Sequence, residues 1–232
     1  MGLYAAAALL AAVLQLLSIA YISCLGSSST VKMTVDQQNT IVFSGENPTA
    51  VVYFLHGLGD SAHGWADAIG AIAKEMPHYD IEAFVGGAGY AEGIDLTRDV
   101  LQSMFAQDVA NGIPRSRIVL GGFSQGGAVS YFTGFQTKQP IGGIMVLSSF
   151  IPREKEFVFA PETADVPLLI CHGDADSRAR YEWATQAKQR LAAAGVKDIE
   201  FHTYPHMDHT SCPQEMQDVT VWLKRVLPAT TS

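Results

Sequence analysis

A serine stands at the centre of a glycine-flanked stretch, Gly-Phe-Ser-Gln-Gly, that runs from Gly122 to Gly126. A serine hydroxyl is a poor nucleophile until a base takes its proton, so chemistry at Ser124 requires a histidine and an acid nearby. Residues 117–120 read as a strand, and residues 128–132 read as a helix. A sharp strand-to-helix turn with small flanking residues is the setting that exposes a nucleophilic serine above a sheet. This context predicts that Ser124 is a nucleophile.

Two later loops offer the acid and the base. In this arrangement the acid and then the histidine follow the serine along the chain, and each loop comes directly after a predicted strand. The residue types leave alternatives open, because Asp174 and Asp208 also suit turns in which the side chain bonds nearby backbone. His172 fits a turn, and His202 alternates within a strand as a structural residue would. The competing candidates are Asp174 and Asp176 for the acid, and His206 and His209 for the base.

A further loop, after the apolar run at residues 51–55, is rich in glycine and reads His56-Gly-Leu-Gly-Asp60. Its glycines allow the backbone to approach a substrate oxygen closely. Acyl transfer needs two N–H donors for the developing oxyanion, one of them from the residue after the nucleophile. The N–H groups of Leu58 and Gln125 are therefore the candidate oxyanion donors.

Composition and charge exclude several functions. The net charge is −8 with no basic cluster, so nucleic acid is not an expected partner, because phosphate binding needs lysine and arginine on one face. Three cysteines without a CxxC pair indicate neither a disulfide framework nor a zinc site. The sequence His206-Met-Asp208-His209 contains metal-ligand types, but no second ligand cluster accompanies it. We expect no metal and no cofactor.

Strand and helix patterns alternate from residue 34 onward, which predicts an α/β fold with a mostly parallel sheet and helices on both faces. In such a sheet the functional loops lie at the carboxyl ends of the strands, where all three loops above are placed. The expected strands cover residues 40–42, 50–55, 81–85, 118–121, 143–147, 167–171 and 199–204. The expected helices cover residues 62–76, 95–111, 125–136, 178–194 and 212–227.

The N-terminal residues 3–25 carry no charged side chain and are long enough, as a helix, to cross a bilayer. We expect a membrane anchor here, with a linker to residue 30 and a catalytic domain over residues 34–228. Lys32 is the nearest positive charge and favours a cytoplasmic catalytic domain. The alternatives are a cleaved signal peptide, which implies the secretory pathway, and a later start at Met33, which implies a soluble cytoplasmic protein.

Five motifs in chain order resemble those of the acyl-protein thioesterase and small carboxylesterase family, the phospholipase/carboxylesterase group of α/β-hydrolases. The resemblance extends from about residue 51 to residue 227. The motifs are Phe54 to Trp65 (FLHGLGDSAHGW), Gly121 to Gly127 (GGFSQGG), Leu147 to Pro152 (LSSFIP), Cys171 to Asp176 (CHGDAD) and His209 to Met216 (HTSCPQEM).

The resemblance implies an α/β-hydrolase fold and a choice among the open candidates. It implies Asp176 as the acid, His209 as the base, and Leu58 and Gln125 as oxyanion donors for Ser124. The implied activity is hydrolysis of thioesters that link fatty acyl chains to protein cysteines, with carboxylesterase activity beside it. S-acylated proteins or lipid esters are then the substrates, and lysophospholipase activity is the alternative. No cofactor is implied.

The chain departs from the family pattern at two places inside the catalytic domain. Family members have a longer segment, which shapes the acyl groove, where this chain has only residues 86–93. A protein that binds without turnover is therefore a further alternative. In addition, Ser177 follows the expected acid where the family prefers proline, and Arg178 and Arg180 enter a stretch that is usually apolar.

Overall fold

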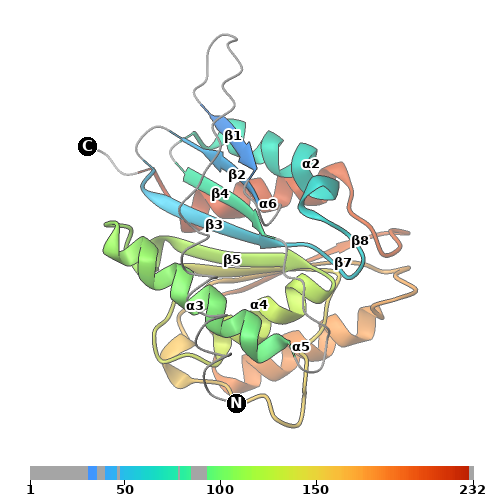
Figure 1. The fold of residues 1–232 in the computed structure, drawn as a ribbon. Helices are drawn as coiled ribbons and strands as arrows, with labels where there is room; N and C mark the ends of the chain where they lie inside the picture. Colours follow the sequence, from blue (N-terminus) through green and yellow to red (C-terminus); the bar gives the residue numbers. More distant parts are fainter. Residues whose placement is uncertain (1–30, 36–39, 46–47, 78, 85–92, 230–232) are drawn as a thin grey trace, which may run out of the picture.

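A computed structural model describes residues 31–35, 40–45, 48–77, 79–84 and 93–229, with the side chains of residues 79–84 left out. These residues form one eight-stranded sheet in the order β1-β2-β4-β3-β5-β6-β7-β8 (Figure 1). The strands are β1 (Lys32–Val35), β2 (Ile41–Ser44), β3 (Ala50–Leu55), β4 (Tyr79–Phe84), β5 (Ile118–Phe123), β6 (Gly143–Leu147), β7 (Leu168–Gly173) and β8 (Ile199–Tyr204).

The sheet is mostly parallel, as the alternation of strands and helices predicts. The six strands in the order β4-β3-β5-β6-β7-β8 run parallel to one another, whereas β2, which pairs with β4, and β1 beyond it add antiparallel pairings at one edge. Strands β3, β6 and β7 are buried along their whole length. Such strands read as continuous apolar runs because helices cover both faces of the sheet.

Helices cover the two faces unequally (Figure 1). On one face, α2 (Ala62–Glu75) and α6 (Pro213–Val226) pack around a core that includes Trp65 and Trp222. On the other face, α3 (Ile94–Ala110), α4 (Gln125–Phe135) and α5 (Tyr181–Ala194) enclose a second core. Two short 3-10 turns, η1 (Arg115–Arg117) and η2 (Pro161–Thr163), lie in connecting segments. The α/β expectation of helices on both faces is confirmed.

The structure corrects several element boundaries. Strand β1 was not expected, and it pairs with β2 through residues that lack a long apolar run. The last helix but one begins at Tyr181 rather than at residue 178, because the N–H groups of Arg178 and Ala179 donate to Asp176. His172 lies in strand β7 opposite Thr203 and not in a turn, since the ladder to β8 continues to Gly173.

The N-terminal segment predicted over residues 1–30 lies outside the described residues, and so does most of the short stretch 86–93. The division into an anchor and a catalytic domain therefore stays a prediction. Within the part of the chain that the structure describes, no helix combines the length and apolarity needed to span a bilayer.

Candidate active site

Ser124 occupies the turn between β5 and α4, where the backbone adopts a conformation that side chains rarely take. Its φ is 53° and its ψ is −115°. The turn is tight because the glycines on either side lie against neighbouring backbone. A Cβ atom on Gly122 would stand 2.5 Å from the Leu55 carbonyl oxygen, and one on Gly126 would stand 2.1 Å from it. The glycines of the motif are thus required by close approach of β3, and the strain at Ser124 is typical of functional turns.

The imidazole of His209 lies between the hydroxyl of Ser124 and the carboxyl of Asp176. Its Nε2 is 2.9 Å from Ser124 Oγ, and its Nδ1 is 2.8 Å from Asp176 Oδ2. A carboxylate only accepts hydrogen bonds, so Nδ1 carries a proton and donates it to Asp176. In the neutral ring Nε2 then accepts a hydrogen bond from the Ser124 hydroxyl. This is the geometry in which a histidine acts as general base toward a serine.

The carboxyl of Asp176 is held in place by the backbone of its own loop. Its Oδ1 accepts the N–H groups of Arg178, at 2.9 Å, and Ala179, at 2.8 Å, while the side chain is fully buried. Because those donors occupy Oδ1, the other oxygen is directed to His209. An oriented, buried acid fixes both the tautomer and the plane of the imidazole.

Aromatic packing limits the movement of His209 from the opposite side. The side chain is 10% exposed, and its ring lies 4.7 Å from the ring of Phe123 at an interplanar angle of 41°. Phe123 in turn contacts Trp65, whose Nε1–H donates to Asp60 at 3.0 Å. This chain of contacts connects His209 to the glycine-rich loop after β3.

The two predicted oxyanion donors lie on segments that meet at Ser124. A Cβ atom on Gly57 would stand 3.4 Å from Ser124 Cβ, which places the loop of Leu58 directly beside Ser124. The Leu58 side chain is 78% exposed. Gln125 is the first residue of α4, and the first N–H groups of a helix have no intrahelical acceptor. Both segments therefore lie beside Ser124, and the role of their N–H groups as oxyanion donors stays a prediction.

A second serine, Ser149, supports the turn from the segment that follows strand β6. The hydroxyl of Ser149 donates to the carbonyl oxygen of Ser124 at 2.5 Å, and the Ser124 N–H donates to the Leu147 carbonyl at 2.9 Å. The two bonds tie both the N–H and the carbonyl group of Ser124 to the segment of residues 147–149. The sequence contains Ser149 within the motif after β6, but nothing in the residue types alone indicates this contact.

The remaining candidates from the two loops lie close by but do not join the Ser124–His209–Asp176 chain. Asp174 accepts the backbone N–H of His206, and Asp208 accepts the N–H of Ser177. His202 is 2.7 Å from Glu200 on the same strand. Among the described residues no group of three acidic, histidine or cysteine side chains is arranged to hold a metal ion.

His172 is a residue whose position the sequence did not predict. It is fully buried, its Nε2 lies 2.7 Å from the Ala179 carbonyl oxygen, and it is 3.4 Å from Asp176 Oδ2. Burial lowers the pKa of His172, more than the nearby carboxylate raises it, so the ring is neutral near pH 7. The Nε2–H therefore donates to Ala179 and ties the loop of Asp176 to strand β7. The one sequence feature that indicated the burial of His172 is that it directly follows an apolar run.

Comparison with known proteins finds a matching family and relatives of similar sequence. A family model described as phospholipase/carboxylesterase matches residues 36–81 and 73–227. The acyl-protein thioesterase 1 of Mycosarcoma maydis is 34% identical in an alignment that covers 80% of this chain and 95% of that protein. The acyl-protein thioesterase 1 of Neurospora crassa is 33% identical, with coverage of 78% and 88%.

Solved structures share the fold at lower identity. Zea mays acyl-protein thioesterase 2 superimposes with a TM-score of 0.67 at 22% identity, covering 81% of this chain and 98% of that one. Esterase PE8 gives a TM-score of 0.69 at 21% identity, with coverage of 80% and 97%.

Proposed function

This chain belongs to the phospholipase/carboxylesterase family of hydrolases, and on that premise we propose that Ser124, His209 and Asp176 form its catalytic triad. The observation that carries the proposal is the continuous chain of hydrogen bonds from Ser124 Oγ through both nitrogens of His209 to Asp176. The bond cleaved is an acyl thioester or ester, in keeping with the thioesterase relatives.

In the first half of the reaction Ser124 Oγ attacks the carbonyl carbon of the substrate. His209 Nε2 takes the hydroxyl proton, and Asp176 stabilises the imidazolium that forms. The N–H groups of Leu58 and Gln125 bind the tetrahedral oxyanion, aided by the positive end of the α4 dipole. Collapse of the intermediate breaks the bond to sulfur or oxygen, the leaving group takes the proton from His209, and an acyl-serine remains.

In the second half, water replaces the leaving group. His209 removes a proton from the water as it attacks the acyl-serine, and the proton then passes to Ser124 Oγ as the free fatty acid departs. The proposed chemistry thus uses water, the triad and the two backbone N–H donors.

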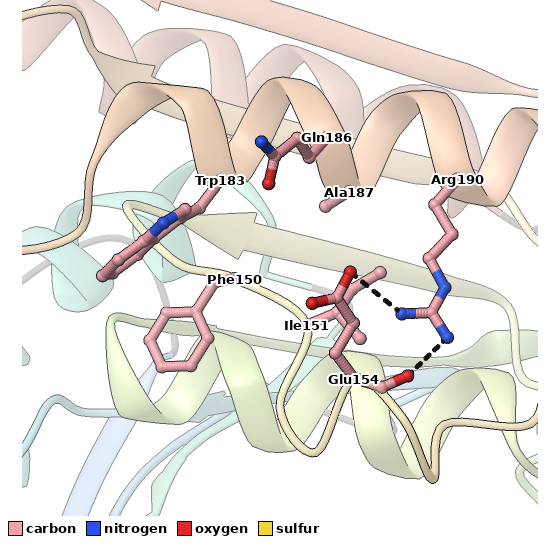
Figure 2. A pocket seen from close by; sticks show the side chains of 7 residues that line it. All are labelled: Phe150, Ile151, Glu154, Trp183, Gln186, Ala187 and Arg190. Atoms are coloured by element: carbon pink, nitrogen blue, oxygen red, sulfur yellow. Dashed lines mark hydrogen bonds and ion pairs between the residues drawn. The ribbon is translucent and has the colours of Figure 1, made fainter.

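A cavity lined at one end by aromatic side chains is the proposed place for the acyl chain. The cavity has a volume of about 230 Å³ and lies between α5 and the segment after β6 (Figure 2). At one end Phe150 and Trp183 meet edge to face, with ring centroids 5.4 Å apart. Phe150 directly follows Ser149, which holds the nucleophile's carbonyl. The lining residues are Phe150, Ile151, Glu154, Trp183, Gln186, Ala187 and Arg190.

The far end of the cavity is polar. Figure 2 shows the Glu154 carboxylate directed at the Arg190 guanidinium, at 3.5 Å, and Arg190 also donates to the Glu154 carbonyl oxygen. An acyl chain is excluded from a position that desolvates this ion pair, because burying charge is costly. The aromatic end therefore receives the chain and the ion pair limits its length. S-acylated proteins are the proposed substrates, and lysophospholipids are the second class to compare.

The test is a purified protein beginning at residue 31, assayed on p-nitrophenyl esters, an S-acylated peptide and a lysophospholipid. Ser124→Ala should lower kcat by about 10⁴-fold or more, because triad members act as a unit. Ser116→Ala, a change at an exposed serine next to β5, is the matched control and should retain full activity.

A fluorophosphonate probe separates catalysis from binding. The probe should label the wild type at Ser124 and leave the Ser124→Ala variant unlabelled. Hydrolysis that persists in Ser124→Ala contradicts the proposed nucleophile. A wild type that neither reacts with the probe nor turns over any substrate supports a binding protein that retains the fold without catalysis.

A further inference from the structure

The loops that carry Asp176 and His209 emerge from neighbouring parallel strands and then lose their ladder. Strands β7 and β8 pair up to Gly173 opposite Tyr204. Beyond this point Asp176 and His209 lie in segments without regular secondary structure. Loops of this kind are mobile unless tied down, whereas general-base catalysis tolerates only small displacements. Some contact between the two loops must therefore set the 2.8 Å distance between His209 Nδ1 and Asp176 Oδ2.

Two aspartates connect the loops in opposite directions. Asp174, on the loop of the acid, accepts the backbone N–H of His206 on the loop of the base, at 2.6 Å. Asp208, on the loop of the base, accepts both the N–H and the hydroxyl of Ser177 on the loop of the acid, at 2.8 and 2.9 Å. We call these four residues the cross-loop brace. Each loop thus donates to the other and accepts from it.

The half of the brace made by Asp208 touches the neighbours of both reacting groups. Ser177 directly follows Asp176, and Asp208 directly precedes His209. The carbonyl of Asp208 also accepts the N–H of Thr210 at 2.7 Å, which turns the backbone around His209. Hydrogen bonds from the Ser177 and His209 N–H groups lower the pKa of Asp208, so it is a carboxylate, and therefore a strong acceptor, at neutral pH.

We propose that Asp208, with Ser177 as its partner, is a positioning residue that holds the imidazole of His209 in register with Asp176. The proposal rests on the proposed function, since it assigns Asp176 and His209 the roles of acid and base. Asp208 touches neither substrate nor Ser124 in this role. It acts by fixing the spacing of two backbone segments, each one residue from a catalytic group.

Ser177 supplies two donors to Asp208 Oδ1, its backbone N–H and its hydroxyl. A proline in place of Ser177 would have neither an N–H nor a hydroxyl, so it would leave Asp208 Oδ1 without both of these donors. Asp174, the other candidate for the acid, and Asp208 each accept a hydrogen bond from the opposite loop.

The experiment compares Asp208→Ala, Asp208→Asn and Ser177→Ala with Asp67→Ala, a control at an exposed aspartate on α2. With a short p-nitrophenyl ester, Asp208→Ala should lower kcat by about 10- to 100-fold and leave KM unchanged, because displacement of about 1 Å has effects of this size. Asp208→Asn keeps the Oδ1 acceptor and should restore most of the lost kcat. Ser177→Ala keeps the N–H donor and should lie between the two.

Wild-type kcat in Asp208→Ala overturns the proposal. The same conclusion follows if Asp208→Asn is as impaired as Asp208→Ala, or if the loss of kcat in all three variants only follows a loss of thermal stability. If Asp208→Ala does not fold, the kcat values of Asp208→Asn and Ser177→Ala test the proposal in its place. Near wild-type kcat in Asp208→Asn with a lowered kcat in Ser177→Ala supports it, and wild-type kcat in Ser177→Ala overturns it.

A readout that does not need turnover separates this proposal from the proposed function. The proton shared by His209 Nδ1 and Asp176 should give a strongly downfield ¹H NMR resonance, assigned by its loss in His209→Ala. The resonance should weaken or move upfield in Asp208→Ala and return in Asp208→Asn, even in a Ser124→Ala background. An unchanged resonance in Asp208→Ala refutes the positioning role, whereas an inactive wild type with the resonance intact refutes only the enzyme assignment.

Discussion

The carboxyl of Glu215 should make the stability of this protein fall as the pH rises toward 8. Glu215 lies in the first turn of α6, its side chain is fully buried, and neither carboxyl oxygen has a hydrogen-bond partner among the described residues. Burial, with a smaller contribution from the Asp218 charge, raises the pKa of Glu215 from 4.5 to about 8. The folded protein therefore keeps this carboxyl protonated at pH 7.

The sign of the effect follows from which state binds the proton. Above pH 4.5 the unfolded chain releases the Glu215 proton, whereas the folded protein holds it until about pH 8. The stabilisation is complete below pH 4.5 and is lost as the pH rises to about 8. In this window each pH unit lowers the free energy of unfolding by about 1.4 kcal/mol, which gives a loss on the order of 4 kcal/mol between pH 5 and 8.

Glu215→Gln removes the titrating group and keeps its shape. Urea unfolding at pH 5, 6, 7 and 8 should show the wild type losing stability relative to the variant by this amount across the series. Glu162→Gln, at an exposed position in η2, is the control and should follow the wild type. Parallel curves for wild type and Glu215→Gln would show that Glu215 is ionised when folded and would refute the reasoning.

Two further changes test the acyl cavity and the turn at Ser124. Trp183→Ala should lower kcat/KM for octanoyl esters by about tenfold and barely affect acetyl esters, because it removes apolar surface from the cavity. Esterase assays measure the ratio of kcat/KM for octanoyl esters to that for acetyl esters. Val221→Ala, a change at an exposed residue of α6, is the control. Gly126→Ala should destabilise folding by about 3 kcal/mol or more, since its Cβ would stand 2.1 Å from the Leu55 carbonyl oxygen. Urea unfolding measures the second effect, and a wild-type midpoint would contradict the close approach.

Local sequence determined the elements and the turn that holds Ser124. Strands β3, β6 and β8 span the residues that their apolar or alternating patterns indicate. The glycines around Ser124 mark a tight strand-to-helix turn because no other residue fits there. Helix α5 shows the limit of such signals, because its pattern extends to residue 178 although Asp176 takes the backbone N–H groups that would begin it.

The choice between neighbouring acids and histidines could not be made from the residue types, because it depends on where two loops meet beyond the ends of β7 and β8. Asp174 and Asp176 are two residues apart and chemically identical, and only the tertiary structure directs Asp176 to His209 and Asp174 to the backbone of the opposite loop. The burial of His172 and Glu215 is likewise a property of packed layers rather than of local sequence. Sequence alone thus determined which chemistry the chain carries, and tertiary contacts decided which side chains are placed to perform it.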